Sequence, residues 1–245
     1  MESLTVFFPM WNEELYAQST LEAAIEVCEA LLADREIGSY ELLVVDDGST
    51  DRTASIVGRM AADQRRVRLI RHSRRRGLGG CLKTGFANAR GELVLYTDAD
   101  LPCDLAELAK ACRLLRYHDA DIVSAYRHDR TGEGPRRAVY SFVYNWLIRL
   151  SFGCHLRDVN FSFKLCRRSI FDHISLESES SFIDAELLIR AHKLGFHTVQ
   201  FGVDYFPRTR GVSTLSSNTV IVAMVRELLR MRQSLNRLAP RGGAR

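Results

Sequence analysis

Short apolar runs alternate with longer, mixed stretches along the first half of the chain. The runs are four or five residues long and rich in Leu, Val, Ile and Phe, which is typical of buried strands. We expect strands at Leu4–Phe8, Leu42–Val45, Val67–Arg71, Leu93–Thr97 and Ile122–Ala125. Between them, apolar positions recur every three or four residues, which predicts helices at Leu15–Ala33, Thr53–Met60, Leu82–Ala89 and Leu105–Arg116. This alternation predicts an α/β fold, with a mostly parallel sheet and helices on both faces.

The composition fits a soluble globular protein. A chain of 245 residues can bury a full core, and 46% hydrophobic and 26% charged residues are ordinary fractions. No uncharged apolar stretch in the sequence reaches the roughly 18 residues that suggest a membrane span, and we expect no secretory signal, since the first residues have a strand pattern. We expect one domain at 1–214, a C-terminal amphipathic helix at 215–239 and a disordered tail at 240–245.

Charge and cysteine content narrow the function classes. The net charge of +4 is mild, and we expect no nucleic-acid partner. Seven arginines lie between residues 65 and 76; we expect most of them to be structural and one or two to lie near a phosphate. The six cysteines are scattered without a Cys-x-x-Cys pair, which argues against zinc or redox chemistry and favours reduced thiols in a cytoplasmic protein.

The end of the fourth expected strand carries two carboxylates. Asp98 and Asp100 follow Leu93–Thr97 and are separated by one residue, so both side chains can point the same way. Open α/β sheets bind ligands at the carboxyl ends of their strands. Two hard oxygen ligands suit Mg²⁺ or Mn²⁺ that also holds a diphosphate. The alternative interpretation is a solvated turn after a strand.

Two further strand ends carry groups suited to a nucleoside. Asp46 follows the second strand, and its carboxylate could accept a hydrogen bond from a ribose hydroxyl or a base N–H. After the first strand, Pro9 ends the ladder and Trp11 offers a stacking face, while Glu13 opens the next helix. Since the ends of parallel strands meet at one sheet edge, we expect one combined site.

The motifs together resemble the inverting family 2 glycosyltransferases of GT-A fold. They are Pro9-x-Trp11-Asn12-Glu13, Val45-Asp46-Asp47-Gly48-Ser49-x-Asp51, Arg76-Gly77-Leu78-Gly79-Gly80 and Asp98-Ala99-Asp100. Their order and spacing are most similar to dolichyl-phosphate mannose synthases and polyprenyl-phosphate glycosyltransferases, from about Leu4 to about Ser213. The resemblance implies a UDP- or GDP-linked sugar donor, Mg²⁺ or Mn²⁺, and a dolichyl or undecaprenyl phosphate acceptor. It also implies a peripheral enzyme at the inner, cytoplasmic face of the membrane.

The resemblance also assigns residue roles. It implies donor contacts from Pro9, Trp11, Glu13, Val44, Asp46, Asp98, Ala99, Asp100, Arg127 and Arg208, with Asp98 and Asp100 holding the metal. Arg137 and Ser141 match an Arg-x-x-x-Ser that holds the acceptor phosphate, and the implied catalytic residues are Asp98, Asp100, Arg137 and Asp158. Other matching segments are Asp158 to Lys164, the acidic pair Asp184 and Glu186 near the acceptor, and a loop from Arg208 to Ser213. Pro102 stands where relatives often carry a glutamine that contacts the metal.

Two segments have the pattern of amphipathic helices on the acceptor side. In 137–150 a narrow polar stripe of Arg137, Ser141, Asn145 and Arg149 faces a broad aromatic and apolar remainder. This favours a helix at a membrane interface; the alternatives are a core helix or a dimer contact, so a homo-oligomer stays open. Val220–Leu238 has one apolar face, which predicts either a helix packed on the domain or lipid contact.

Three functions remain open from the sequence. A phosphate acceptor is already anionic and needs cationic positioning rather than a general base, which the basic acceptor region favours. A polysaccharide or other hydroxyl acceptor would need a base, for which Asp158 is the candidate. A non-catalytic membrane-binding module would leave the acidic strand ends unexplained. A sugar-nucleotidyltransferase is disfavoured because no glycine-rich loop lies between Phe8 and Glu14.

Overall fold

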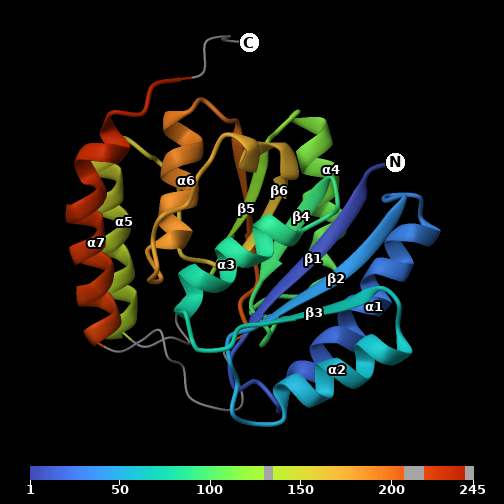
Figure 1. Cartoon of the computed structure of the whole chain (residues 1–245). Coiled ribbons are helices and arrows are strands. Elements are labelled where there is room, and N and C mark those ends of the chain that lie inside the picture. Colours follow the sequence, from blue (N-terminus) through green and yellow to red (C-terminus); the bar gives the residue numbers. More distant parts are fainter. Residues whose placement is uncertain (130–134, 207–217, 241–245) are drawn as a thin grey trace.

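The fold is an α/β sandwich built on one mixed sheet (Figure 1). The computed structural model describes residues 1–129, 135–206 and 218–240, without the side chains of 135–140 and 218–221. The strands are β1 (Ser3–Met10), β2 (Ser39–Asp46), β3 (Val67–Arg71), β4 (Leu93–Thr97), β5 (Ile122–Arg127), β6 (Phe163–Arg167) and β7 (Thr198–Val203). The helices are α1 (Ala17–Ala33), α2 (Thr53–Asp63), α3 (Gly77–Asn88), α4 (Glu107–Tyr117), α5 (Pro135–Phe152), α6 (Ile183–Lys193) and α7 (Asn218–Asn236).

The sheet has seven strands in the order β3-β2-β1-β4-β6-β5-β7. All neighbouring strands are parallel except β6, which runs antiparallel to both β4 and β5. The predicted α/β class and mostly parallel sheet are therefore confirmed. In a parallel arrangement with β-α-β crossovers, the carboxyl ends of β1, β2 and β4 lie along one edge, where ligands bind in such folds.

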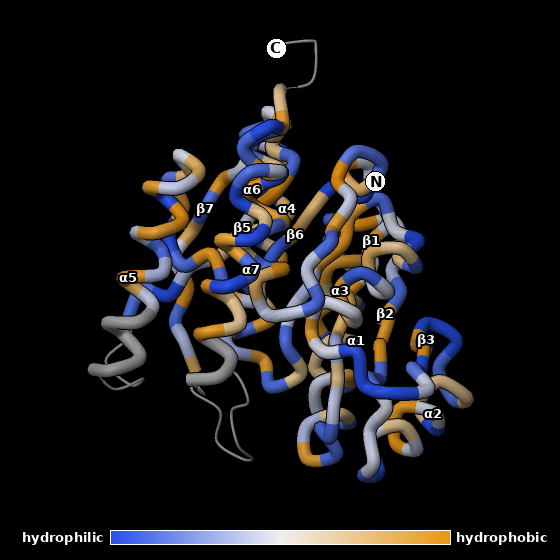
Figure 2. The backbone as a smooth tube through the Cα atoms, turned by 60° about the vertical axis from the view of Figure 1, so that its left-hand side comes forward, coloured by the Kyte–Doolittle hydropathy of each residue, from blue (hydrophilic) through white to orange (hydrophobic). Residues whose placement is uncertain are grey.

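Helices cover both faces of the sheet and bury two separate cores. Along β1, Val6 and Phe8 point into the core beneath α1 and α4, whereas Phe7 points into the core beneath α3 and α6. This alternation is the two-residue period of a strand buried on both faces. Figure 2 shows hydrophobic residues following the central strands β1 and β2. The helices α5 and α7 lie side by side at the β7 end of the molecule (Figure 1).

Several predicted boundaries differ from the structure. The helix expected at Leu82–Ala89 begins already at Gly77, because a buried carboxylate accepts hydrogen bonds from its first amides. The second strand is longer than expected at both ends, running over Ser39–Asp46. Strands β6 and β7 had no expected counterpart, because Lys164 and Arg167 interrupt the apolar run of β6 and Gln200 and Gly202 that of β7.

Candidate active site

The three strand ends expected to form one site do lie together. Strand β1 is flanked by β2 and β4, with Met10 opposite Asp46 and Phe7 opposite Tyr96 in the register. The residues that follow these strands, including Trp11 and Asp98, therefore leave the sheet at the same edge. Pro9 does not end the ladder as expected, because β1 continues through it to Met10; Glu13 lies in the loop that follows. The Val44 side chain is fully buried in the core, so any contact with a donor would come from its backbone.

The loops after β1 and β2 hold each other in place. The Asn12 amide donates to Ser49 Oγ at 2.9 Å, and the Thr50 amide donates to Asn12 Oδ1 at 2.9 Å. The Glu13 amide donates to Thr53 Oγ1 at 2.8 Å. Asn12 has a φ of 53°, a left-handed conformation that asparagine tolerates better than most residues. The polar residues between Asp46 and Thr53 thus fix the position of Trp11 and Glu13.

Asp46 is buried and covered by an arginine from β3. Its Oδ1 accepts a hydrogen bond from the Ser49 amide at 3.2 Å, and its side chain has no exposed surface. The Arg71 Nε atom lies 3.0 Å from Asp46 Oδ2, and the Arg71 guanidinium also donates to the Ser49 carbonyl at 3.0 Å. More than half of the Arg71 side chain is exposed. A donor that approaches Asp46 would therefore first meet Arg71.

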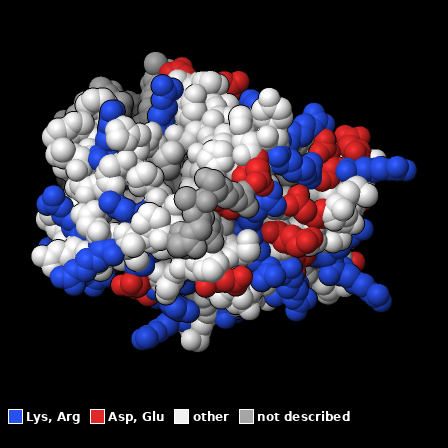
Figure 3. All heavy atoms as spheres, turned by 90° about the horizontal axis from the view of Figure 1, so that it is seen from above, with Lys and Arg blue, Asp and Glu red and all other residues white. Residues whose placement is uncertain are grey.

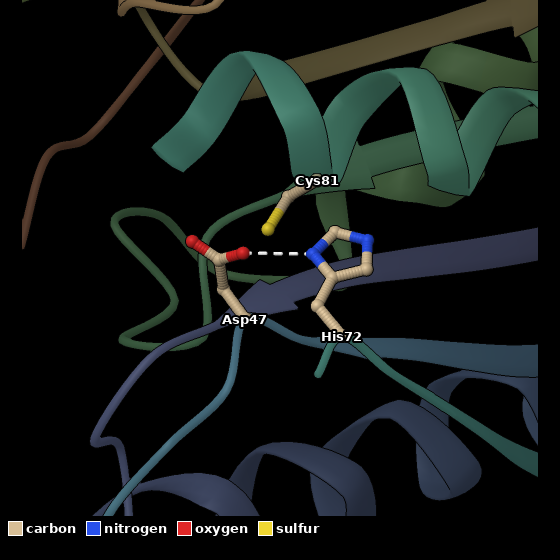
Figure 4. Close-up of side chains that lie close together, drawn as sticks. All are labelled: Asp47, His72 and Cys81. Atoms are coloured by element: carbon tan, nitrogen blue, oxygen red, sulfur yellow. Dashed lines mark hydrogen bonds and ion pairs between the residues drawn. The ribbon is translucent and has the colours of Figure 1, made fainter. Parts of the chain in front are cut away.

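The neighbouring Asp47 joins His72 and Cys81 in a cluster of metal-ligand residue types (Figure 4). Asp47 Oδ1 lies 2.7 Å from His72 Nδ1 and accepts the Arg76 amide at 2.8 Å, while its Oδ2 accepts the Gly77 amide at 2.8 Å. His72 Nε2 lies 2.9 Å from Thr84 Oγ1. Burial and the nearby Asp47 raise the pKa of the Cys81 thiol, which keeps it protonated. These hydrogen bonds occupy the ligand atoms, so the cluster fastens the start of α3 rather than presenting a metal site.

Asp98 and Asp100 stand together at the end of β4, both half-buried. Burial and the adjacent Asp100 raise the pKa of Asp98 to about 7, although a hydrogen bond with Ser162 and the charge of Lys164 act in the opposite direction. The Ala99 carbonyl between them accepts a hydrogen bond from Thr20. Two carboxylates this close repel each other when both are ionised, and a bound divalent cation would neutralise both charges. The residues present therefore fit a hard divalent metal ion.

Beneath Asp98 lies a buried polar group that links three elements. Lys164 Nζ from β6 donates to Asp184 Oδ1 at 2.7 Å and to the Phe161 carbonyl at 2.6 Å. The same atom lies 5.6 Å from the ring centroid of Tyr96, whose hydroxyl is 3.5 Å from Asp98 Oδ1. Lys164 and Tyr96 have no exposed surface. The sequence named Lys164 and Asp184 within separate motifs but gave no sign of their pairing.

The partner expected beside Asp184 has a different position. Glu186 accepts hydrogen bonds from the Glu177 and Ser178 amides at 2.9 and 2.8 Å, and from Arg190 Nε at 2.7 Å. It is fully buried. The two carboxylates of the acidic pair therefore point to different surroundings: Asp184 faces Lys164 below the metal-type residues, whereas Glu186 stabilises the loop before α6.

Arg127, expected to contact the donor, and Asp158, the candidate base for a hydroxyl acceptor, bind each other. Arg127 Nε lies 2.7 Å from Asp158 Oδ2 and its Nη2 lies 2.7 Å from Asp158 Oδ1, a two-point pair. The guanidinium also lies over the rings of Phe161 and Tyr205, 5.5 and 5.2 Å from their centroids. Asp158 would have to release Arg127 before it could take a proton from a hydroxyl acceptor.

Helix α5 has one buried and one exposed apolar face. Tyr144, Ile148 and Phe152 are buried in the core, whereas Phe142, Trp146 and Leu150 are 72%, 53% and 66% exposed. The polar position Asn145 donates to the Ser141 carbonyl at 2.7 Å and accepts the Val159 amide at 3.2 Å. The half-buried Ser141 thus lies on the helix side that meets the loop carrying Asp158.

The C-terminal helix α7 packs back on the domain. Met224, Leu228, Met231 and Leu235 are buried in the same core as α6. Within the part of the chain that the structure describes, no helix combines the length and apolar character needed to cross a membrane. The Arg137 side chain, Arg208 and the loop to Ser213 lie outside the described residues.

Comparison with known proteins decides the family. The sequence model described as "Glycosyl transferase family 2" matches residues 5–175, which include both the nucleoside-type and the metal-type strand ends. The chain belongs to glycosyltransferase family 2. The resemblance drawn from the four motifs is therefore confirmed at the level of the family.

Relatives and structural neighbours agree with this family. Glycosyltransferase AglD of Haloferax volcanii is 35% identical over 211 residues, which cover 84% of this chain and 33% of that protein. The undecaprenyl-phosphate 4-deoxy-4-formamido-L-arabinose transferase of Pectobacterium carotovorum is 28% identical, over 88% of this chain and 63% of its own. The mannosyltransferase PcManGT of Pyrobaculum calidifontis, solved with GDP-Man and Mn²⁺, superposes with a TM-score of 0.63 at 19% identity, covering 96% of this chain and 68% of that chain.

The chain spans 33% of the length of AglD and 63% of the length of the formamido-arabinose transferase. The structural likeness supports the GT-A fold expected from the motifs.

Two features of this family 2 site were not foreseen from the sequence. The Asp47–His72 contact joins residues 25 positions apart, and the Arg127–Asp158 pair joins residues 31 positions apart. His72 lies inside the arginine-rich segment 65–76 and belongs to no recognisable motif there. No local pattern signals either contact, because an N-cap side chain ordinarily bonds amides two or three residues further on, whereas Asp47 accepts the amides of Arg76 and Gly77.

Proposed function

We propose that this protein transfers a sugar from a nucleotide-diphospho-sugar to a polyprenyl phosphate at a membrane surface. The observation that carries the proposal is the meeting of Trp11, Asp46 and the Asp98–Asp100 pair at one edge of the sheet. A stacking ring, a carboxylate for a ribose or base and a metal-type pair follow one another across β2, β1 and β4. That order matches the nucleoside and diphosphate parts of a single donor.

Asp98 and Asp100 would hold Mg²⁺ or Mn²⁺. The Ala99 side chain between them is buried in the core, so any contact with the donor there would come from its backbone. The bound ion would neutralise charge on the departing nucleoside diphosphate. Arg127 and Arg208 are the candidates for further neutralisation of that charge. The raised pKa of Asp98 supports the proposal, because burial first and the adjacent Asp100 charge second make the ionised carboxylate unfavourable until a cation neutralises it. The neighbour solved with GDP-Man and Mn²⁺ supports it further by sharing the fold.

A phosphate acceptor fits the acceptor side better than a hydroxyl. A phosphate is anionic near neutral pH and can attack without a general base, whereas a hydroxyl must lose a proton. The candidate base Asp158 is tied to Arg127 through both oxygens. Arg137 and Ser141 would position the phosphate, and the undecaprenyl-phosphate relative is named for an acceptor of that class.

Helix α5 would bring the protein to the lipid that carries this phosphate. Its exposed Phe142 and Trp146 are of the kind that enter the bilayer interface. Helices α5 and α7 carry six arginines, three in each, and one carboxylate, Glu227. Seen from above, the α5 and α7 side of the surface is mostly uncharged or basic with few acidic residues, whereas acidic and basic residues are intermixed on the opposite side (Figure 3). Such a face suits an anionic membrane.

We place the reaction at the inner, cytoplasmic face of that membrane. All six cysteines are free and buried, which suits a reducing compartment. Sugar transfer to a polysaccharide or other hydroxyl remains the second candidate, since family 2 membership alone does not select the acceptor. A non-catalytic membrane module remains the alternative of another class.

A transfer assay tests these alternatives together. Radiolabelled UDP- and GDP-sugars are incubated with the protein, Mn²⁺ or Mg²⁺, and vesicles containing dolichyl or undecaprenyl phosphate. We expect label to enter the organic phase with at least one donor and to require the divalent ion. Label that enters only water-soluble hydroxyl acceptors would favour the second candidate, and no transfer or donor hydrolysis under any condition would favour the non-catalytic module. The Asp100→Ala variant is the matched negative control.

A further inference from the structure

A hydroxyl group from helix α1 reaches the turn that carries the two proposed metal ligands. Thr20 Oγ1 donates a hydrogen bond to the carbonyl oxygen of Ala99, the residue between Asp98 and Asp100. Thr20 and Ala99 are both buried, although 79 positions separate them in the sequence. Because water cannot replace a hydrogen bond that is lost at a buried carbonyl, this contact constrains the turn more than an exposed contact would.

The hydroxyl of Thr20 is not required by the helix in which it lies. Within α1, all of which the structure describes, Thr20 is the one buried residue with a hydroxyl group; the other buried residues are Ala17, Leu21, Ala24, Cys28 and Leu31. A threonine inside a helix can bond the carbonyl of the preceding turn, but Thr20 bonds a different element. Alanine or leucine would favour the helix more. The contact with Ala99 therefore accounts for this polar residue.

The carbonyl that Thr20 holds controls the direction of the second carboxylate. It belongs to the peptide group between Ala99 and Asp100, which is planar and turns as one unit. Its orientation therefore fixes how the Asp100 side chain leaves the backbone relative to Asp98. The turn is tight, since the Leu101 amide donates to the Asp98 carbonyl at 3.2 Å. Leu101 has a φ of 47°, which leucine rarely adopts, so the turn depends on support from its surroundings.

Helix α1 presents Thr20 from a fixed position. The Glu13 carbonyl accepts the Ala17 amide at 2.8 Å where the helix begins. The Glu14 amide donates to Asp51 Oδ2 at 3.1 Å, which ties the start of the helix to the loop after β2. Thr20 lies about one helical turn from this start. Its hydroxyl is therefore held by the backbone of a packed element and can support the turn after β4.

We propose that Thr20 is a positioning residue for the metal-binding pair. Its hydroxyl fixes the peptide between Ala99 and Asp100, and through that peptide the placement of Asp98 and Asp100 around a divalent cation. This inference rests on the proposed function and adds a residue that supplies no ligand atom to the ion. Residues that orient metal ligands from outside the coordination sphere change metal affinity by about 10- to 100-fold when they are replaced.

Electron paramagnetic resonance of free Mn²⁺, at pH 8 and without any donor, tests the inference. Thr20→Val keeps the shape of the side chain and removes the hydroxyl, and we expect it to bind Mn²⁺ about tenfold more weakly than the wild-type protein. Thr20→Ser keeps the hydroxyl and should bind Mn²⁺ nearly as well as the wild type. If Thr20→Val does not fold, Thr20→Ala compared with Thr20→Ser gives the same contrast, since both lack the methyl group and differ in the hydroxyl.

Two control variants separate metal positioning from folding. Thr5 is buried near the beginning of β1, at the opposite end of the strand from the site, and its Oγ1 donates to Glu41 Oε1 at 2.8 Å. Thr5→Val should lower the thermal melt and leave Mn²⁺ affinity unchanged. Ser19 is exposed on α1 and donates to the Tyr16 carbonyl at 3.0 Å. Ser19→Ala should change neither the melt nor the affinity.

Three results would overturn the inference and leave the proposed function standing. The first is unchanged Mn²⁺ affinity in Thr20→Val, and the second is a loss in Thr20→Ser as large as that in the variant without a hydroxyl. The third is an equal loss in Thr5→Val, because affinity would then follow the stability of the fold and not the contact with Ala99. If the wild-type protein binds no Mn²⁺, the proposed metal role fails and the inference fails with it.

Discussion

The ammonium group of Lys164 lies 2.7 Å from Oδ1 of Asp184, and both side chains are buried under the carboxylates that end β4. Lys164 comes from β6, the strand that runs against its neighbours, and Asp184 from α6. The pair therefore joins the sheet to the helix layer directly below the proposed metal site. A buried charge is tolerated only when it is paired, so each partner depends on the other.

Removing one partner should be costly. Lys164→Met leaves Asp184 without its counter-ion, and we expect a loss of about 3–5 kcal/mol in the free energy of unfolding. Combining Lys164→Met with Asp184→Asn removes both charges and should recover much of that loss. Urea denaturation followed by circular dichroism measures both. A loss below about 1 kcal/mol in the single variant would mean that Asp184 finds another partner or becomes protonated without strain.

The raised pKa of Asp98 predicts a pH dependence with a definite sign. Its folded-state pKa of about 7 lies above the ordinary value of 3.8, so between these values the folded protein holds a proton that the unfolded chain has released. The metal-free protein should therefore lose stability as pH rises through this window, and Asp98→Asn should flatten that part of the curve. Thermal melts from pH 4 to 8 with a chelator provide the measurement.

The same pKa makes metal binding compete with a proton. Since Asp98 must be ionised to hold a cation, Mn²⁺ affinity at pH 6 should be about tenfold weaker than at pH 8. Electron paramagnetic resonance of free Mn²⁺ measures this without any donor present. Equal affinity at the two pH values would show that Asp98 is not a ligand or that its neighbours hold it ionised.

Asp100 is the variant that separates metal chemistry from folding. Asp100→Ala should abolish metal-dependent transfer, yet the metal-free melt should stay close to that of the wild type because a like-charge contact is removed. Relief from the Asp100 charge should also move the pKa of Asp98 downward. Full activity in Asp100→Ala, or metal-independent transfer by the wild-type protein, would rule out the proposed metal role.

The exposed face of α5 predicts a separable membrane function. Replacing Phe142 and Trp146 together by Ser should reduce co-sedimentation with anionic vesicles and transfer to a long polyprenyl phosphate, while transfer to a short water-soluble analogue survives. Binding by the wild-type protein should weaken with salt. The control is Tyr117→Ser, an exposed aromatic residue at the end of α4 and away from α5 and α7. Equal loss of both transfer activities in the double variant would make α5 a structural element only.

A glycine on α3 tests how closely the donor side is packed. A Cβ at Gly79 would lie 2.3 Å from the Ser178 carbonyl oxygen and 2.6 Å from the Glu179 backbone. We expect Gly79→Ala to cost about 1–3 kcal/mol of stability. Gly58→Ala, where a Cβ inside α2 meets nothing within 4 Å, should instead stabilise by about 0.5–1 kcal/mol. Chemical denaturation distinguishes the two, and equal effects would contradict the packing described here.

The sequence predicted β1, β2 and β4 and the residues that follow them, but it predicted fewer features of the half that contains β6 and β7. The strands that end at Met10, Asp46 and Thr97 contain continuous apolar runs, so both their existence and their common edge could be predicted. Strand β6 could not, because the charge of Lys164 looks like a surface residue until Asp184 is brought to it by the fold. The Arg127–Asp158 pair depends on a left-handed backbone at Asp158, with a φ of 49°, which no local pattern signals.

The antiparallel direction of β6 determines where the segment between β5 and β6 begins and ends. Strand β5 ends at Arg127 and β6 begins at Phe163, and because one runs up and the other down, both points lie at the same edge of the sheet. The ion pair between Arg127 and Asp158 joins the two ends of the segment that connects β5 to β6. A change of length between these two points leaves the order of the strands unaltered, provided that α5 keeps Tyr144, Ile148 and Phe152 in the core. Under the proposed function, a change of acceptor would therefore fall on this segment, whereas the strand ends of β1, β2 and β4 proposed for the donor would keep their positions.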